Sequence, residues 1–156
     1  METNKNVKIR GFEVVTDSKR KHPGVDIELP TLGTEKAMAC DFYSPVDLTI
    51  EAGKIGKIWS DVKAYMGDNE GLILNVRSSQ GGKVALANTQ GWIDGDYYEN
   101  ESNDGNIGIF LKNIGNEPYV IKKGDKIAQG AFFPVLKPDG IVSNNKRVGG
   151  FGSTGR

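Results

Sequence analysis

The stretch "KKGDKIAQGAFFP", residues 122–134, predicts a tight turn followed by a strand. Gly124 and Asp125 supply the backbone conformations that a turn needs. The run that follows is strand length and apolar, and one polar side chain, Gln129, interrupts it. A polar side chain in such a run needs a hydrogen-bond partner if it is buried, so Gln129 is either a structural hydrogen bonder or a ligand contact.

Runs of the same kind recur along the 156-residue chain, and Gly, Pro, Asn or Asp bounds each of them. They include "VKIRGFEVV", "VDLTI", "KIGKIW", "GLILNV", "NIGIFL" and "PYVI". No window keeps apolar residues at helical spacing over three turns, and the one short helical turn that we expect lies at residues 62–66. The sequence therefore predicts a single all-β domain over residues 1–156, a jelly-roll or barrel of many short strands, with a mobile tail over residues 136–156.

Composition excludes several classes of function. The chain has 20 basic and 20 acidic residues, a balance that does not indicate a general binder of nucleic acid or of membrane surfaces. One cysteine, Cys40, and one histidine, His22, leave no internal disulfide and make a zinc site of such ligands unlikely. The N-terminal residues form no apolar run of a signal peptide or membrane span, so we expect a reducing, cytoplasmic setting.

The segment "GWIDGDYYEN", residues 91–100, runs from a strand into a turn. Gly95 permits a tight turn, which would place Asp94 at the end of the strand, where its carboxylate can meet a ligand. Such a carboxylate can act as a general base toward water. The alternative is that Asp-Gly-Asp is only a hairpin turn. The polar stretch that follows, residues 98–106, is interpreted as a surface loop.

The segment "NVRSSQGGK", residues 75–83, combines the fork-shaped donor of Arg77 with the hydroxyls of Ser78 and Ser79. Guanidinium, hydroxyl and glycine-exposed amide groups suit phosphate oxygens, although a polar turn explains the same residues. The tail "RVGGFGSTGR", residues 147–156, has the composition of a phosphate cradle. It lacks the lysine and the following helix of a P-loop, and a Gly/Ser tail is the alternative.

Five segments appear in the order and at the spacing of the five motifs of the homotrimeric all-β dUTPases, the deoxyuridine triphosphate nucleotidohydrolases, so the sequence resembles that family. The segments are "MACDFYS", "VRSSQGGK", "NTQGWIDGDY", "GDKIAQ" and "GGFGSTG", which together span residues 38–155.

The resemblance implies a hydrolase that converts dUTP to dUMP and pyrophosphate. Asp94 would activate the water that attacks the α-phosphorus. Asn88 would hydrogen-bond the uracil edge with backbone groups of the hairpin, including Gly91. Tyr97 would lie against the deoxyribose and leave no room for a 2′-hydroxyl.

The resemblance also implies a phosphate site. Arg77 and Gln129 would complete the catalytic set, with Gln129 and Ser78 on α- and β-phosphate oxygens and Ser79 as a further substrate contact. Mg²⁺ would accompany the triphosphate, and Asp41 would lie in its outer shell, through water.

In the family, the tail of one subunit closes over a site that two others build, so the resemblance implies a homotrimer with shared active sites. The tail residues that would contact substrate are Phe151, which would stack on uracil, Gly152, Ser153 and Thr154. The family's tail arginine falls at Lys146, while Arg147 lies one place closer to the phenylalanine, so either could reach the γ-phosphate.

Two other functions remain open from sequence. One is the related dCTP deaminase activity, which shares the β fold. The other is a regulatory role in which residues 98–106 contact a partner protein.

Overall fold

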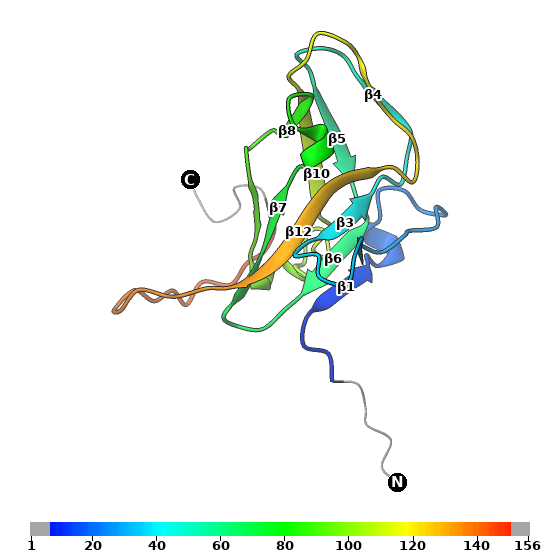
Figure 1. Ribbon diagram of the computed structural model, residues 1–156. Coiled ribbons are helices and arrows are strands. Elements are labelled where there is room, and N and C mark those ends of the chain that lie inside the picture. The colour runs from blue at the N-terminus through cyan, green and yellow to red at the C-terminus, as the bar shows by residue number, and fades with distance from the viewer. Residues whose placement is uncertain (1–6, 151–156) are drawn as a thin grey trace.

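The computed structural model describes residues 7–150, and the regular structure in that range is almost entirely β (Figure 1). Three 3₁₀ turns, η1 (Asp17–Lys19), η2 (Ser78–Gln80) and η3 (Gly95–Tyr97), join some of the strands. None of these turns is long or apolar enough to cross a bilayer. The predicted all-β class is confirmed. In chain order the strands are β1 (Gly11–Val14), β2 (Thr31–Leu32), β3 (Cys40–Tyr43), β4 (Leu48–Ile50), β5 (Ile55–Trp59), β6 (Val62–Tyr65), β7 (Glu70–Asn75), β8 (Val84–Leu86), β9 (Gly91–Ile93), β10 (Gly108–Asn113), β11 (Tyr119–Ile121) and β12 (Lys126–Pro134).

The nine-residue strand β12 is the centre of the largest sheet, whose order is β2-β3-β12-β7-β9. It pairs antiparallel with β3 on one side and with β7 on the other. Directly opposite residues share a face of a sheet, so Gln129 of β12 lies on the same face as Asp41 of β3 and Asn75 of β7. The polar residue that interrupts the apolar run therefore belongs to a polar row across three strands.

The neighbouring residue Gly130 lies on the opposite, apolar face. A Cβ at Gly130 would lie 2.7 Å from Cδ2 of Leu74 and 3.0 Å from Cε2 of Phe42, so the core closes directly onto this backbone. Both of those side chains are at most 2 % exposed. A separate three-stranded sheet, β5-β10-β8, contributes Ile109 and Leu111 to the same core, and both are fully buried.

The helical turn expected at residues 62–66 is wrong, because residues 62–65 form strand β6, antiparallel to β1. Val62 and Ala64 are buried, and so is Lys63 between them. The Nζ atom of Lys63 lies 2.9 Å from Oδ2 of Asp104, so an ion pair keeps this charged side chain inside. The conformation here depends on pairing with β1, which is distant in the sequence, and on the buried pair of Lys63 and Asp104. Neither partner lies within the short stretch of sequence from which the turn was predicted.

Residues 98–106 form turns without a helix or strand, as expected of a loop, but most of the segment is not at the surface. Of these nine described residues, only Glu99, Glu101 and Ser102 are exposed. The Oδ1 atom of Asn100 accepts hydrogen bonds from the backbone amides of Ser102 and Asn103, at 3.1 and 3.2 Å. A side chain that satisfies backbone donors lets a polar segment fold onto the protein instead of into water.

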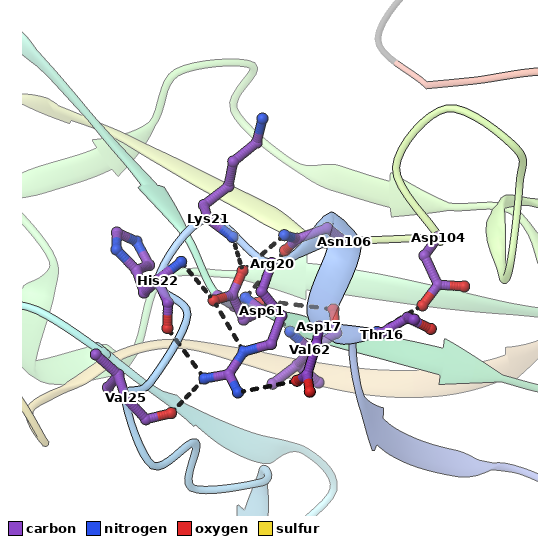
Figure 2. Close-up of polar contacts among 11 residues, drawn as sticks. Thr16, Asp17, Arg20, Lys21, His22, Val25, Asp61, Val62, Asp104 and Asn106 are labelled. Carbon is purple, nitrogen blue, oxygen red and sulfur yellow. Dashed lines mark hydrogen bonds and ion pairs between the residues drawn. The ribbon is translucent and has the colours of Figure 1, made fainter.

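The far end of this segment reaches a buried polar cluster around Asp61 (Figure 2). The Asp61 carboxylate is fully buried and accepts hydrogen bonds from the backbone amides of Lys21 and His22, at 2.8 and 2.9 Å. Asn106 donates to the same carboxylate at 2.8 Å and accepts from the Asp61 amide at 2.9 Å. The cluster joins the N-terminal arm, the β5–β6 corner and the segment 98–106.

Replacement of Gly130 by alanine tests the close approach of the core to β12. We expect Gly130→Ala to lower the free energy of unfolding by about 1–3 kcal/mol, because the added methyl group must displace Leu74 and Phe42. Urea unfolding measures the change. Gly115→Ala is the matched control, since its Cβ would make an ordinary 3.5 Å contact with Asn113. Equal losses in the two variants would contradict the packing argument.

The Lys63–Asp104 pair predicts a pH dependence of stability. Burial opposes ionisation of Asp104, but hydrogen bonds from Thr16 and the Lys63 ammonium outweigh it and lower the pKa below the ordinary 3.8. A carboxyl whose folded pKa is depressed stabilises the protein above its unfolded pKa, and this contribution is lost as the pH falls through the folded value. The stability gap between the parent protein and Asp104→Asn should therefore be largest near neutral pH and shrink below about pH 4.

Urea unfolding at a series of pH values measures that gap. Glu101→Gln, which removes an exposed charge from the same segment, is the control and should track the parent protein throughout. A gap for Asp104→Asn that stays constant down to acid pH would refute the assignment.

Candidate active site

A cavity of about 460 Å³ opens between the β8–β9 connection, strand β10 and the turn η3. Asn88 of that connection and Gly91 at the start of β9 line it, and Phe110 of β10 forms part of the apolar wall. Thr89, which follows Asn88, has a left-handed backbone with φ of +66°, and this conformation turns the chain between β8 and β9. Its size and mixed apolar and polar lining suit a planar ring with a polar edge.

Asp94 lies between the end of β9 and the start of η3, at the rim of this cavity. Its carbonyl accepts a hydrogen bond from the amide of Tyr97 at 3.1 Å, so the chain enters a 3₁₀ turn there and not a two-residue hairpin. The Asp94 side chain is 65 % exposed. It also borders a second hollow of about 450 Å³, which contains Asp96, Glu70 and Lys137. Asp94 thus faces solvent on both sides of the rim, where a water molecule can reach it.

Arg147 pairs with the Asp94 carboxylate. One guanidinium nitrogen, Nη2, pairs with Asp94, and Nε lies 2.7 Å from Oδ1 of Asp96. Nη1 donates to the carbonyl of Gly149 at 3.1 Å, and the side chain is only 12 % exposed. Lys146, in contrast, is exposed. The two candidate tail cations therefore occupy different positions: Arg147 lies on the carboxylates and Lys146 faces solvent.

The ring of Tyr97 forms one wall of the cavity and is 5 % exposed. Its hydroxyl donates to the backbone carbonyl of Asn106 and accepts from Nδ2 of Asn103 at 2.9 Å. Burial raises the pKa of Tyr97, so the hydroxyl stays protonated. Gly150 lies so close that a Cβ there would be 2.4 Å from Cε2 of the ring, which only glycine allows. The tail after β12 thus returns to the chain's own cavity.

A separate hollow of about 270 Å³ collects the residues that the sequence associates with phosphate, namely Arg77, Ser78, Asp41 and Gln129. The Nε atom of Arg77 donates to Oδ1 of Asp41 at 2.9 Å, and Nη1 lies 3.5 Å from Oγ of Ser79. The ammonium of Lys126 lies 3.4 Å from the other oxygen of Asp41. Asp41 is therefore held between two cations and orients the guanidinium of Arg77.

Gln80 positions this hollow, and sequence reasoning missed it. Its side chain is 2 % exposed, accepts from the Arg77 amide at 2.8 Å and donates to the Ile127 carbonyl at 2.9 Å. It therefore fastens the turn η2 to strand β12. Gln80 lies three residues after Arg77, and this spacing is the only signal that the sequence offered.

Among residues 7–150 the two cavities share no lining residue. The predicted site residues divide between them: Asn88, Gly91, Asp94, Tyr97 and Arg147 line the first, and Asp41, Arg77, Ser78 and Gln129 line the second. Ser79 and Lys146 line neither, and Phe151, Gly152, Ser153 and Thr154 lie outside the described residues. One chain thus places these candidate residues in two separate hollows.

No cluster of three acidic, histidine or cysteine side chains able to hold a metal ion occurs in the described part of the chain. Burial and the nearby charge of Asp41 raise the pKa of the Cys40 thiol, which disfavours the reactive thiolate.

Comparison with protein-family models matches residues 25–155 to the dUTPase family. The chain belongs to the dUTPase family. A relative in the dUTPase family, the deoxyuridine 5′-triphosphate nucleotidohydrolase of Lactococcus lactis, is 41 % identical over 96 % of this chain and 99 % of its own. The resemblance drawn from the five motifs is confirmed, and the chain is a dUTP nucleotidohydrolase.

Solved dUTPase structures share the fold. The dUTPase from Streptococcus mutans superposes with a TM-score of 0.72 at 37 % identity, covering 83 % of this chain and 99 % of that one. The dUTPase from phage phi11 of S. aureus, whose structure is described with a structural Mg(II) ion, superposes with a TM-score of 0.65 at 18 % identity, over 87 % and 97 % of the two chains. The second likeness concerns the fold alone.

Proposed function

We propose that this dUTPase cleaves dUTP by attack of an Asp94-activated water on the α-phosphorus. The carboxylate takes a proton from the water as the new phosphorus–oxygen bond forms. The bond from the α-phosphorus to the oxygen that bridges it to the β-phosphate breaks, and pyrophosphate leaves with the bonding electrons. The observation that carries the proposal is the position of Asp94 at the rim of the ring-sized cavity, open to water.

The cavity at Asn88, Phe110 and Tyr97 is the proposed uracil and deoxyribose site. The amide of Asn88 can both donate to and accept from the edge of the base. The buried ring of Tyr97 would lie against the sugar at C2′ and exclude a hydroxyl there. This arrangement favours a deoxyribonucleotide over a ribonucleotide, and the family match favours hydrolysis of dUTP over the deaminase alternative.

The phosphate half-site is proposed to come from a neighbouring copy in a homotrimer. Arg77, Ser78 and Gln129 line a hollow that shares no residue with the base cavity. Within one chain, the proposed phosphate site and the proposed base site are therefore separate. A symmetric assembly can place one copy's phosphate half against the next copy's base half. The Arg77 fork, held by Asp41, would then meet the α- and β-phosphate oxygens.

Mg²⁺ fits this arrangement as a companion of the triphosphate. It favours phosphate oxygens and retained waters over an all-protein cage, which agrees with the donor set of the described residues. When bound, it would neutralise phosphate charge and polarise the phosphorus–oxygen bonds. Asp41 is the residue proposed to contact its water shell.

The tail is proposed to close the site, with Phe151 on uracil and Gly152, Ser153 and Thr154 at the phosphates. Arg147 would anchor the start of this lid by pairing with Asp94 and Asp96. The two carboxylates can belong to the same chain, as described here, or to a neighbouring copy. Lys146, which is exposed, is the cation proposed for the γ-phosphate.

Replacement of Asp94 by asparagine tests the general base. We expect Asp94→Asn to lower kcat for pyrophosphate release from dUTP by about 10²–10⁴-fold, the usual contribution of a positioned base. Asp96→Asn is the matched control, because it also removes a carboxylate from Arg147 but leaves the base in place. The proposal fails if Asp94→Asn keeps the parent rate, or if the two variants lose activity equally.

The two tail cations are distinguished by comparing dUTP with dUDP, which lacks the γ-phosphate. We expect Lys146→Ala to reduce the preference for dUTP about 10- to 100-fold, because it loses a charge-assisted contact with that group. Arg147→Ala should keep the preference. Steady-state kcat/KM for both nucleotides measures the effect, and the reverse pattern would assign the γ-phosphate to Arg147.

A further inference from the structure

The segment 98–106 holds both polar ends of Tyr97. At the hydroxyl end, the Tyr97 hydroxyl donates a hydrogen bond to the carbonyl of Asn106 and accepts one from Nδ2 of Asn103 at 2.9 Å. At the backbone end, Nδ2 of Asn100 donates to the Tyr97 carbonyl at 2.7 Å. Three asparagines of one segment therefore contact a single aromatic residue of the cavity wall.

The groups that hold the hydroxyl are themselves fixed. The Oδ1 atom of Asn103 accepts from the amide of Gly105 at 3.0 Å and from Asn100 at 2.7 Å, so its amide group has one orientation. Asn106 is fully buried and exchanges two hydrogen bonds with Asp61, which is also fully buried (Figure 2). The hydroxyl of Tyr97 is thus connected to the rigid polar cluster that joins the N-terminal arm to the core.

We infer that the segment 98–106 is a specificity element, and that Asn103 is a positioning residue which holds the Tyr97 ring against the sugar so that ribonucleotides are rejected. The inference rests on the proposed role of Tyr97 in excluding a 2′-hydroxyl. It assigns to the segment a function inside the active site instead of a partner-binding surface. Only three of its nine residues are exposed, which leaves little of it to offer a partner.

Steric rejection of a 2′-hydroxyl requires that the Tyr97 ring keeps its position. A 2′-hydroxyl adds one atom to the sugar, and a displacement of the ring by part of an ångström would admit it. The ring of Tyr97 can move either by sliding along its own axis or by tilting about its Cα–Cβ bond. Hydrogen bonds at the hydroxyl oppose both movements at the point farthest from the backbone. A hydroxyl with donor and acceptor both satisfied in a buried site gives them up only at a cost.

Asn103 is the side chain through which this can be tested, because the Asn106 contact is made by a backbone carbonyl. We expect Asn103→Ala to lower the ratio of kcat/KM for dUTP to kcat/KM for UTP about tenfold, mainly by a gain in UTP turnover. Tyr97→Phe, which keeps the ring and removes the hydroxyl, should lower the ratio by a similar factor. The kcat of Asn103→Ala for dUTP should stay within about threefold of the parent value, because Asn103 does not line the cavity.

A double-mutant cycle separates positioning from general stability. If Asn103 acts through the Tyr97 hydroxyl, Asn103→Ala should change the ratio in the parent background and leave it unchanged in the Tyr97→Phe background. Glu101→Ala, at an exposed position of the same segment, is the matched control and should keep the parent ratio. Thermal unfolding of each variant reports any loss of stability independently of the ratio.

The outcomes distinguish the inference from the proposal on which it rests. Tyr97→Leu with an unchanged ratio would overturn the role of Tyr97 itself, and the inference with it. A lowered ratio for Tyr97→Leu together with a parent-like ratio for Asn103→Ala would overturn the inference alone. Additive effects of Asn103→Ala and Tyr97→Phe would also overturn it, because the asparagine would then act by a route other than the hydroxyl.

Discussion

The buried carboxylate of Asp61 is the constraint on which the rest of the site depends. A charge that is fully withdrawn from water must have its hydrogen bonds satisfied, and Asp61 takes them from Lys21, His22 and Asn106. Ion pairing adds Arg20, whose Nε lies 3.6 Å from Oδ2 (Figure 2). Three segments that are distant in the sequence are thereby fixed relative to one another. One of these segments contains Asn106, whose carbonyl accepts a hydrogen bond from the hydroxyl of Tyr97 in the cavity wall.

Strand β12, at the centre of the five-stranded sheet, carries Gln129 into the lining of the second hollow. Its apolar face is closed by the core at Gly130, so its register cannot slip without a clash. That register puts Gln129 between Asp41 and Asn75. Gln80 ties the turn that carries Arg77 and Ser78 to the same strand. The proposed phosphate site is thus built on a central strand, while the proposed base site is built on the β8–β9 connection and the turn η3.

The start of the tail, residues 147–150, contacts the rim and the wall of the cavity. Arg147 pairs with the carboxylate proposed as the base and with Asp96 beside it, and Gly150 lies against Tyr97 where no side chain would fit. These contacts hold residues 147–150 against the turn η3.

The sequence by itself determined the β class and the family motifs, and it supplied the candidate site residues. Strand-length runs bounded by turn residues are local patterns, and the types and spacing of Asp94, Asn88 and Arg77 are visible without coordinates. Only the tertiary structure decided that residues 62–65 form a strand and that most of residues 98–106 pack against the protein. Both depend on partners far away in the sequence: β1 and Asp104 in one case, and Tyr97 and Asp61 in the other. The division of the site into two separate cavities was equally out of reach, because strand order and register arise from the packing of the whole sheet.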